Sequence, residues 1–381
     1  MVNILQALPL AAHLKRGPAE HKGDAGKVLI IGGAENMAGA LILAGLGSLH
    51  CGAGWTVLLM LDTQSAQITQ DHPELMIHNA NNQLPFDAIA SIKPDVIAIG
   101  PGLGQSALAF QYLQTVLPLT VPLILDADAI HLIAANPALL KQLRNRKDPS
   151  VLTPHPGEAA VLLQSNTEVI QRDRNQAIKE LIQLTGANIV LKGHQTLIGS
   201  PKQEIQLCLE GNPGMGSGGM GDVLTGAIAA IAAQGIRHQL DLWQSVCLAV
   251  QIHALAGDQL TKKNIGPIGM TASELSLQMR QTLNQAISKH ARHPQWMKPA
   301  IAVFCGSHDG INANWQKETF QLGQAIAQNH WRLIFGGGGR GLMGTVAKGA
   351  LQNQGEVIGF IPDFLRKIEP ILEGATEIHI V

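Results

Sequence analysis

One stretch of the chain combines glycine with an acidic residue in a pattern that suits phosphate chemistry. Glycine recurs through residues 211–221, and Asp222 then opens an apolar run over residues 223–233 that predicts a buried helix. The free N–H groups and the positive dipole end at such a helix start form an anion site. Asp222 could simply cap the helix, or it could take a proton from a hydroxyl group that attacks phosphorus. The choice between these readings depends on what else lies near this helix start.

Polar residues also follow several short apolar runs earlier in the chain. They are Asp126 and Asp128 after residues 122–125, His155 and Glu158 after residues 151–153, and Lys192 after residues 188–191. Asp126 and Asp128 could orient Mg²⁺ or cap the next helix. His155 lies between two prolines that fix the backbone, which favours a positioned ligand contact. Lys192 offers a cation, although its segment could be an ordinary hairpin turn.

These residues need a scaffold that brings strand ends together. Short apolar runs over residues 27–31, 55–61, 95–99, 122–125, 151–153 and 188–191 alternate with helical segments such as 39–50, 105–116 and 172–185. This alternation predicts an α/β fold, with a parallel sheet and helices on both of its faces. Ligands of such sheets bind beyond the carboxyl ends of the strands, which is where the polar residues gather.

The same pattern restarts near the C-terminus. Two helical segments, 240–258 and 271–287, precede a polar, basic stretch with a proline that predicts a linker at residues 289–298. Apolar and helical segments then predict a second α/β unit over residues 299–381 with about three strands. Its glycine-rich turn at residues 336–341 could accept a phosphate at the start of the following helix. We therefore expect one domain over residues 1–288 and another over residues 299–381.

Composition narrows the class of protein. A chain of 381 residues is long enough for two or more domains. The formal net charge of −1 argues against attraction to nucleic acid or to anionic membranes. The four cysteines lack metal-ligand spacing and predict free thiols in a reducing compartment. Residues 1–22 lack the pattern of a secretion signal. We expect a cytoplasmic protein with no nucleic-acid or membrane partner.

Several motifs, taken in their order along the chain, are similar to those of one family. They are Lys22-Gly23, residues 73–76, residues 100–104, residues 125–129, residues 152–158, residues 190–193 and residues 212–226. From about residue 14 to residue 287 the chain resembles the ADP-dependent (S)-NAD(P)H-hydrate dehydratases, which have a ribokinase-like fold. The resemblance implies ADP as co-substrate, Mg²⁺ as cofactor, and hydrated NADH or NADPH (NADHX or NADPHX) as substrate. We also expect a homo-oligomer and, acting on the same substrate pool, an NAD(P)HX epimerase whose domain we do not expect in this chain.

The resemblance also implies roles for individual residues. Asp222 would be the catalytic base. The residues implied to contact the hydrated nicotinamide nucleotide are Ala40, Gly102, His155 and Asp222, and those implied to hold ADP or AMP are Lys192, Gly193, His194, Gln195, Thr196 and Gly221. Asp126 and Asp128 remain candidate Mg²⁺ ligands, and the metal ligands stay unassigned.

The expected reaction uses ADP to turn a poor leaving group into a good one. Asp222 would take the proton of the ring hydroxyl, which attacks the terminal phosphoryl group of ADP, while N–H groups of residues 217–221 stabilise the developing charge. Phosphate then leaves, giving NAD(P)H, AMP and phosphate. Two alternatives stay open: a small-molecule kinase of the same fold, and a non-catalytic nucleotide-binding module. A stable phosphorylated product would indicate the kinase, and ADP binding without turnover would indicate the module.

The second unit resembles a different family. Gly306-Ser307, residues 336–339, residues 341–344 and residues 359–362 are similar to motifs of the Rossmann-like Lonely Guy phosphoribohydrolases. The resemblance covers the first half of that family's pattern, and the segments that carry its catalytic residues would fall after Val381. We therefore expect no phosphoribohydrolase activity from residues 299–381.

Overall fold

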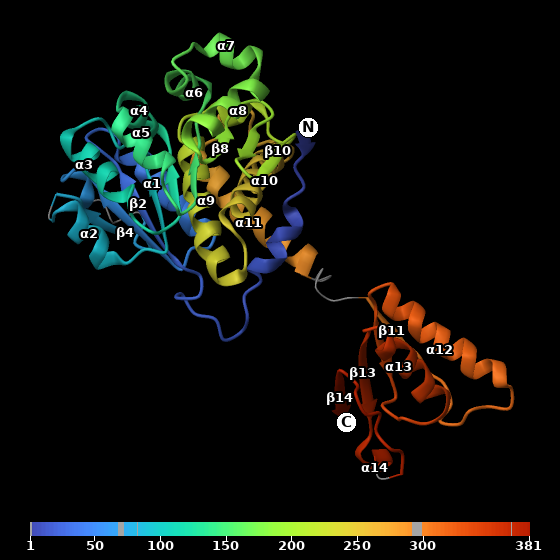
Figure 1. Ribbon diagram of the computed structural model, residues 1–381. Helices are drawn as coiled ribbons and strands as arrows, with labels where there is room; N and C mark the ends of the chain where they lie inside the picture. The colour runs from blue at the N-terminus through green and yellow to red at the C-terminus, as the bar shows by residue number, and fades with distance from the viewer. Residues whose placement is uncertain (1, 68–71, 82, 292–298, 367) are drawn as a thin grey trace. The chain divides into compact units, whose positions relative to one another are not determined.

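The computed structural model describes residues 2–381 except 68–71, 82, 292–298 and 367. The chain divides into two compact units, Met1–Arg292 and His293–Val381 (Figure 1). Residues 289–291, predicted to begin the linker, instead continue α11 (Ala272–Ala291), and the remaining linker residues, 292–298, lie outside the described part. None of the described helices is both long enough and apolar enough to cross a membrane.

The first unit is built on a ten-stranded sheet in the order β1-β10-β9-β8-β7-β6-β5-β2-β3-β4. Its parallel strands are β2 (Lys27–Gly32), β3 (Trp55–Met60), β4 (Met76–Asn79), β5 (Val96–Ile99), β6 (Leu123–Leu125), β7 (Ser150–Leu152) and β8 (Asn188–Leu191). The strands at one edge were not predicted. There β9 (Leu197–Ser200) pairs antiparallel with β8 and with β10 (Gln203–Leu207), and β1 (Val2–Ile4) pairs parallel with β10. The sheet is therefore mixed rather than wholly parallel.

Alternate residues of the central strands face two separate cores. Val28 and Ile30 belong to one buried cluster, whereas Leu29 and Ile31 belong to the other. Because both faces are covered, β2 is apolar from Val28 to Ile31, as strands of parallel sheets usually are. One face carries α1 (Ala38–His50), α9 (Met220–His238), α10 (Leu242–Lys262) and α11. The other carries α2 (Pro85–Ile92), α3 (Ala107–Val116), α4 (Ala127–Ala135), α5 (Pro137–Arg144), α6 (Pro156–Leu162), α7 (Thr167–Arg172) and α8 (Arg174–Thr185).

Helix α9 lies inside the unit and is buried almost all round. The backbones of α9 and α1 lie in close contact at Gly226. A Cβ atom added at this residue would lie 1.8 Å from the carbonyl oxygen of Ala44. Only glycine permits this approach of the two backbones. Short 3-10 turns complete the unit at Leu8–Leu14, Ser65–Gln67 and Pro213–Gly216, the last of these within the glycine-rich stretch.

The second unit has a parallel sheet of four strands, whereas about three strands were expected from the sequence. Its order is β11 (Ala300–Ala302), β12 (Arg332–Phe335), β13 (Glu356–Ile361) and β14 (Glu377–Ile380). The helices are α12 (Ala313–Gln328), α13 (Gly341–Gln352) and the short α14 (Asp363–Arg366). The strand β14 was not predicted, because it is mostly exposed and its sequence has no continuous apolar run.

Three N–H groups at the glycine-rich turn and the start of α13 are bonded within the protein. Leu342 and Met343 donate their N–H groups to the carbonyls of His308 and Gly306, at 3.3 and 3.2 Å. Gly339 donates to the carbonyl of Pro370 at 2.8 Å. These three donors are therefore not available to a phosphate, and phosphate binding by the other N–H groups of residues 336–341 stays a prediction.

Candidate active site

Asp222 lies in the first turn of α9 without capping it. The residue at the N-cap is Gly219, whose φ of 86° places it in the left-handed region, and no side chain caps this helix. The capping interpretation of Asp222 is therefore wrong. A carboxylate at this position stays free for other chemistry, next to backbone N–H groups that can bind an anion.

The environment of Asp222 favours its protonated form. Burial and then the negative charge of Asp126 raise the pKa of Asp222 to about 7, against the opposing charge of Lys192. The carboxylates of Glu158 and Asp128 act in the same direction as Asp126. A general base works best when its pKa lies near the operating pH, so this carboxyl group suits proton transfer at neutral pH.

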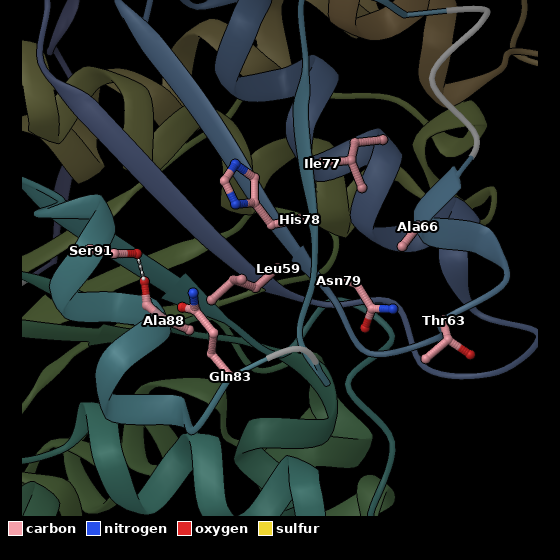
Figure 2. A pocket seen from close by; sticks show the side chains of 9 residues that line it. All are labelled: Leu59, Thr63, Ala66, Ile77, His78, Asn79, Gln83, Ala88 and Ser91. Atoms are coloured by element: carbon pink, nitrogen blue, oxygen red, sulfur yellow. Dashed lines mark hydrogen bonds between the residues drawn. The ribbon is translucent and has the colours of Figure 1, made fainter.

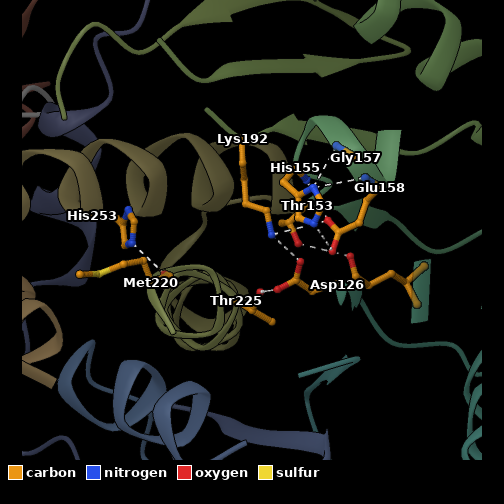
Figure 3. A network of polar contacts seen from close by, with 10 residues as sticks. Asp126, Thr153, His155, Gly157, Glu158, Lys192, Met220, Thr225 and His253 are labelled. Atoms are coloured by element: carbon orange, nitrogen blue, oxygen red, sulfur yellow. Dashed lines mark hydrogen bonds and ion pairs between the residues drawn. The ribbon is translucent and has the colours of Figure 1, made fainter. Parts of the chain in front are cut away.

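A buried ion pair connects two strand ends with α9 (Figure 3). Asp126, which is 1% exposed, accepts a hydrogen bond of 2.8 Å from Lys192 Nζ and one of 2.7 Å from Thr225 Oγ1. Burial alone would raise the pKa of Asp126, but the charge and hydrogen bond of Lys192 and the bond from Thr225 hold it below its usual value. Thr225 lies three residues after Asp222 in α9, so the pair fixes the helix that carries the proposed base.

These contacts argue against Asp126 as a metal ligand. Both of its carboxylate oxygens accept hydrogen bonds from protein groups. Asp128 Oδ2 accepts the N–H group of Gly104 at 2.8 Å. Within the described part of the chain, no group of three or more His, Cys, Asp or Glu side chains could hold a metal ion. The residues present do not fit a Mg²⁺ site built from protein ligands alone.

His155 caps α6 and is joined to Lys192 through Glu158. His155 Nδ1 accepts the N–H groups of Gly157 and Glu158 at 3.0 and 3.2 Å. Nδ1 is therefore unprotonated, and Nε2, which lies 3.3 Å from Glu158 Oε1, carries the proton. The other oxygen of Glu158 lies 3.9 Å from Lys192 Nζ. His155 is thus both a cap and a residue with a fixed tautomer, and 55% of its side chain is exposed.

Two of the residues expected to contact the substrate lie beside each other. A Cβ atom added at Gly102, where φ is +56°, would lie 3.2 Å from the Cβ atom of Ala40 and 2.6 Å from the carbonyl oxygen of Met37. The carbonyl of Gly102 accepts the N–H group of Ala34 at 2.6 Å. Gly102 therefore brings the loop after β5 against the start of α1. No described hydrogen bond joins Ala40 or Gly102 to Asp222.

A cavity of about 430 Å³ opens beside the start of α9. It is lined by all six residues expected to hold ADP or AMP, namely Lys192, Gly193, His194, Gln195, Thr196 and Gly221. The segment from Lys192 to Thr196 is the hairpin turn between β8 and β9, as the alternative interpretation had it, and this turn lines the cavity. A Cβ atom at Gly221 would lie 3.2 Å from Lys192 Nζ, so the absent side chain leaves room for the ammonium group. Ala40, Gly102, His155 and Asp222 are not among the residues that line this cavity.

Two residues that organise the cavity were missed by the sequence reasoning. Arg174 on α8 donates to the carbonyls of Leu191 at 2.8 Å and Lys192 at 3.2 Å, and also to that of His194. Asp258 on α10 accepts the N–H group of Gly211 at 3.0 Å and the side-chain amide of Asn212 at 3.2 Å. Both residues form hydrogen bonds with loops that are distant from them in sequence. A lone Arg or Asp on a helix does not reveal such contacts in the sequence.

A second cavity lies at β3, β4 and α2, as Figure 2 shows. Its volume is about 550 Å³. Of its described lining residues His78 is the ionisable one, and Thr63, Asn79, Gln83 and Ser91 supply uncharged polar groups. It therefore lacks the paired carboxylate and ammonium groups that surround Asp222.

Comparison with known proteins agrees with the two-part organisation. Residues 28–281 match the NAD(P)H-hydrate dehydratase family, and residues 298–377 match the SLOG cluster4 family. The bifunctional NAD(P)H-hydrate repair enzyme Nnr of Vibrio cholerae is 41% identical over 269 residues, which are 71% of this chain and 52% of that protein. The chain thus spans about half the length of such bifunctional relatives.

A shorter relative and a solved structure match over nearly their whole lengths. The ADP-dependent (S)-NAD(P)H-hydrate dehydratase of Neisseria meningitidis is 32% identical over 290 residues, covering 74% of this chain and 94% of the relative. A crystal structure of the ADP/ATP-dependent NAD(P)H-hydrate dehydratase from Bacillus subtilis, co-crystallised with ATP/Mg²⁺, has a TM-score of 0.64 and 29% identity. That alignment covers 75% of this chain and 99% of the Bacillus chain.

Proposed function

The chain belongs to the NAD(P)H-hydrate dehydratase family, and on that premise we propose that it dehydrates the S epimer of NADHX or NADPHX at the expense of ADP. The observation that carries the proposal is the position of Asp222. Its carboxyl group, with a pKa raised to about 7 by burial and by Asp126, lies one residue from Gly221, which lines the 430 Å³ cavity. A base and a nucleotide pocket thus meet at one helix start.

The reaction begins with proton transfer and phosphoryl transfer. Asp222 takes the proton from the hydroxyl group on C6 of the hydrated ring, and the oxygen forms a bond to the terminal phosphorus of ADP. The bond between that phosphorus and the bridging oxygen breaks, and AMP leaves. Base catalysis of this kind typically contributes about 10²–10⁴-fold. Donors aimed at the phosphoryl oxygens must supply much of the remaining acceleration.

Elimination then restores the reduced nicotinamide. The lone pair of the ring nitrogen expels phosphate from C6, and loss of a proton from C5 forms the C5–C6 double bond. The sum is hydrate plus ADP giving NAD(P)H, AMP and phosphate. Lys192 and the N–H groups at the start of α9 are placed to bind the phosphates of the nucleotide. Mg²⁺ enters this proposal as a companion of the nucleotide phosphates, and no step depends on it.

The direct test combines the purified chain of 381 residues with NADHX and ADP. The proposal expects the absorbance band of reduced nicotinamide to return, with AMP and phosphate formed in equal amounts. A stable phosphorylated product would instead indicate a kinase, and ADP binding without any turnover would indicate a nucleotide-binding module. An epimerase that interconverts the R and S hydrates would supply the substrate. The homo-oligomer and the cytoplasmic location stay predictions.

A further inference from the structure

The nucleotide cavity contains a histidine to which the dehydration chemistry gives no role. His253 on α10 is 9% exposed and lines the cavity. Its Nε2 atom lies 3.0 Å from the carbonyl oxygen of Met220, the first residue of α9, as Figure 3 shows. A carbonyl oxygen can only accept a hydrogen bond, so Nε2 carries the proton of the ring.

The second ring nitrogen is therefore a hydrogen-bond acceptor. Burial lowers the pKa of His253 to about 4, so the ring is neutral and Nδ1 keeps its lone pair at neutral pH. Nδ1 has no hydrogen-bond partner among the described residues. The described side-chain atoms that are both enclosed and unpartnered are Arg174 Nε, His290 Nε2 and Glu369 Oε2. Nδ1 of His253 is not one of them, and its residue lines the cavity, so this acceptor is open to a ligand.

An acceptor in this position cannot serve a phosphate. Phosphate oxygens also accept hydrogen bonds, and their donors in this cavity are Lys192 and the N–H groups near Gly221. Five apolar residues line the cavity together with His253, namely Met215, Met220, Leu224, Val250 and Ala254. Such a pocket suits the flat, largely apolar part of a nucleotide, in which a single polar group fixes identity.

We propose that His253 determines which nucleotide the cavity accepts, because its Nδ1 atom receives a hydrogen bond from a donor on the nucleoside. That donor is the exocyclic amine of adenine or a hydroxyl of the ribose. The inference rests on the proposed function in one respect, namely that ADP occupies this cavity. A nucleotide that lacks the donor leaves the acceptor unpaired, which costs affinity.

The test is titration calorimetry of the full chain with ADP and three analogues, each of which lacks one donor. The analogues are inosine diphosphate, 2′-deoxy-ADP and 3′-deoxy-ADP. We expect wild type to bind one analogue about 5- to 10-fold more weakly than ADP, as the loss of one hydrogen bond predicts. His253→Phe should bind ADP more weakly by a similar factor and should no longer distinguish that analogue. The analogue that binds more weakly to wild type identifies the donor, because it is the one that lacks it.

Two further variants separate specificity from folding. His253→Gln keeps both a donor and an acceptor, so it should retain part of the discrimination and serves if His253→Phe does not fold. His50→Phe removes a half-buried histidine that bonds Ser276 away from the cavity, and it should leave every affinity ratio unchanged. The proposal is overturned if wild type binds all four nucleotides equally. It is also overturned if the Phe and Gln variants keep the wild-type ratios. Calorimetry needs no turnover, so a protein that discriminates nucleotides without dehydrating NADHX would refute the proposed function alone.

Discussion

Lys192 Nζ lies 2.8 Å from Asp126 Oδ1, and this pair joins the carboxyl ends of β8 and β6. Lys192 Nζ also lies 3.9 Å from Glu158 Oε2, so one ammonium group is paired with two buried carboxylates. Asp222 ionises within reach of the same charges, and the surplus of negative charge adds to the effect of burial on its pKa. The ion pair therefore helps to hold α9 in position, and its two charges act in opposite directions on the pKa of Asp222, which burial raises most.

The first prediction concerns turnover. Asp222→Asn removes the proton acceptor and keeps the size of the side chain, so NADHX dehydration should fall by about 10²–10⁴-fold. The affinity for ADP should stay within about twofold, because Asp222 does not line the nucleotide cavity. Steady-state rates and calorimetry measure the two quantities. Asp87→Asn, at an exposed position on α2, is the matched control. A variant close to the wild-type rate would remove Asp222 from the mechanism.

The second prediction concerns stability against pH. The pKa of Asp222 is raised from 3.8 to about 7 on folding, so the protonated form is favoured in the folded state. The stability that protonated Asp222 gives the folded state is fully present below its pKa in the unfolded chain. That stability is lost as pH rises through its pKa in the folded protein. Asp222→Asn should therefore be more stable than wild type above neutral pH, by on the order of 4 kcal/mol, and nearly equal to it at about pH 4. Denaturant unfolding at both pH values measures the difference, and a gain that does not depend on pH would contradict the prediction.

The third prediction separates two roles of Lys192. Lys192→Ala leaves Asp126 buried without its cation, which should lower the free energy of unfolding by about 3–5 kcal/mol. It should also weaken ADP binding more than it slows the reaction of bound ADP. Adding Asp126→Asn to this variant removes the unpaired charge, so stability should partly return while ADP affinity stays low. Recovery of both, measured by unfolding and calorimetry, would mean that Lys192 acts on the nucleotide only through the fold.

The fourth prediction concerns the turn that carries the nucleotide residues. Arg174 donates to three carbonyls of residues 191–194, a pattern that the single ammonium group of lysine cannot reproduce. Arg174→Lys should therefore raise the dissociation constant of ADP by about tenfold, with kcat at saturating ADP within about twofold. Arg172→Lys, two residues earlier at an exposed position, should change neither. An Arg174 variant with wild-type affinity would show that the turn holds its shape without this anchor.

The sequence predicted the central sheet well because burial on both faces leaves a plain signal. Residues 28–31 and 96–99 are apolar throughout, and they correspond to β2 and β5 at the centre of the sheet. The strands β9 and β10 were missed because one face of β10 is exposed and its sequence, Gln203–Leu207, is largely polar. Such a strand is defined by its pairing with β9, which composition does not reveal.

The site was predicted where it follows from local motifs and missed where it depends on distant contacts. Asp222 could be proposed as a candidate base because glycine and an acidic residue open a helix within one short stretch. The ion pair of Asp126 was not predicted, because its partners Lys192 and Thr225 are 66 and 99 residues away. The role of His155 as a cap was equally hidden, since it depends on which ring nitrogen faces the helix.

The contact of Gly226 with Ala44 has a mechanical consequence. With α9 and α1 packed backbone to backbone, neither helix can slide or roll without a collision between main-chain atoms. The start of α9 is therefore rigid, and it should keep its position when a nucleotide binds. Displacement on binding should fall instead on the turn between β8 and β9, which is held by the side chain of Arg174 rather than by close backbone packing. Amide hydrogens in the middle of α9 should accordingly exchange slowly whether or not ADP is bound, whereas those of the turn should become protected when it binds.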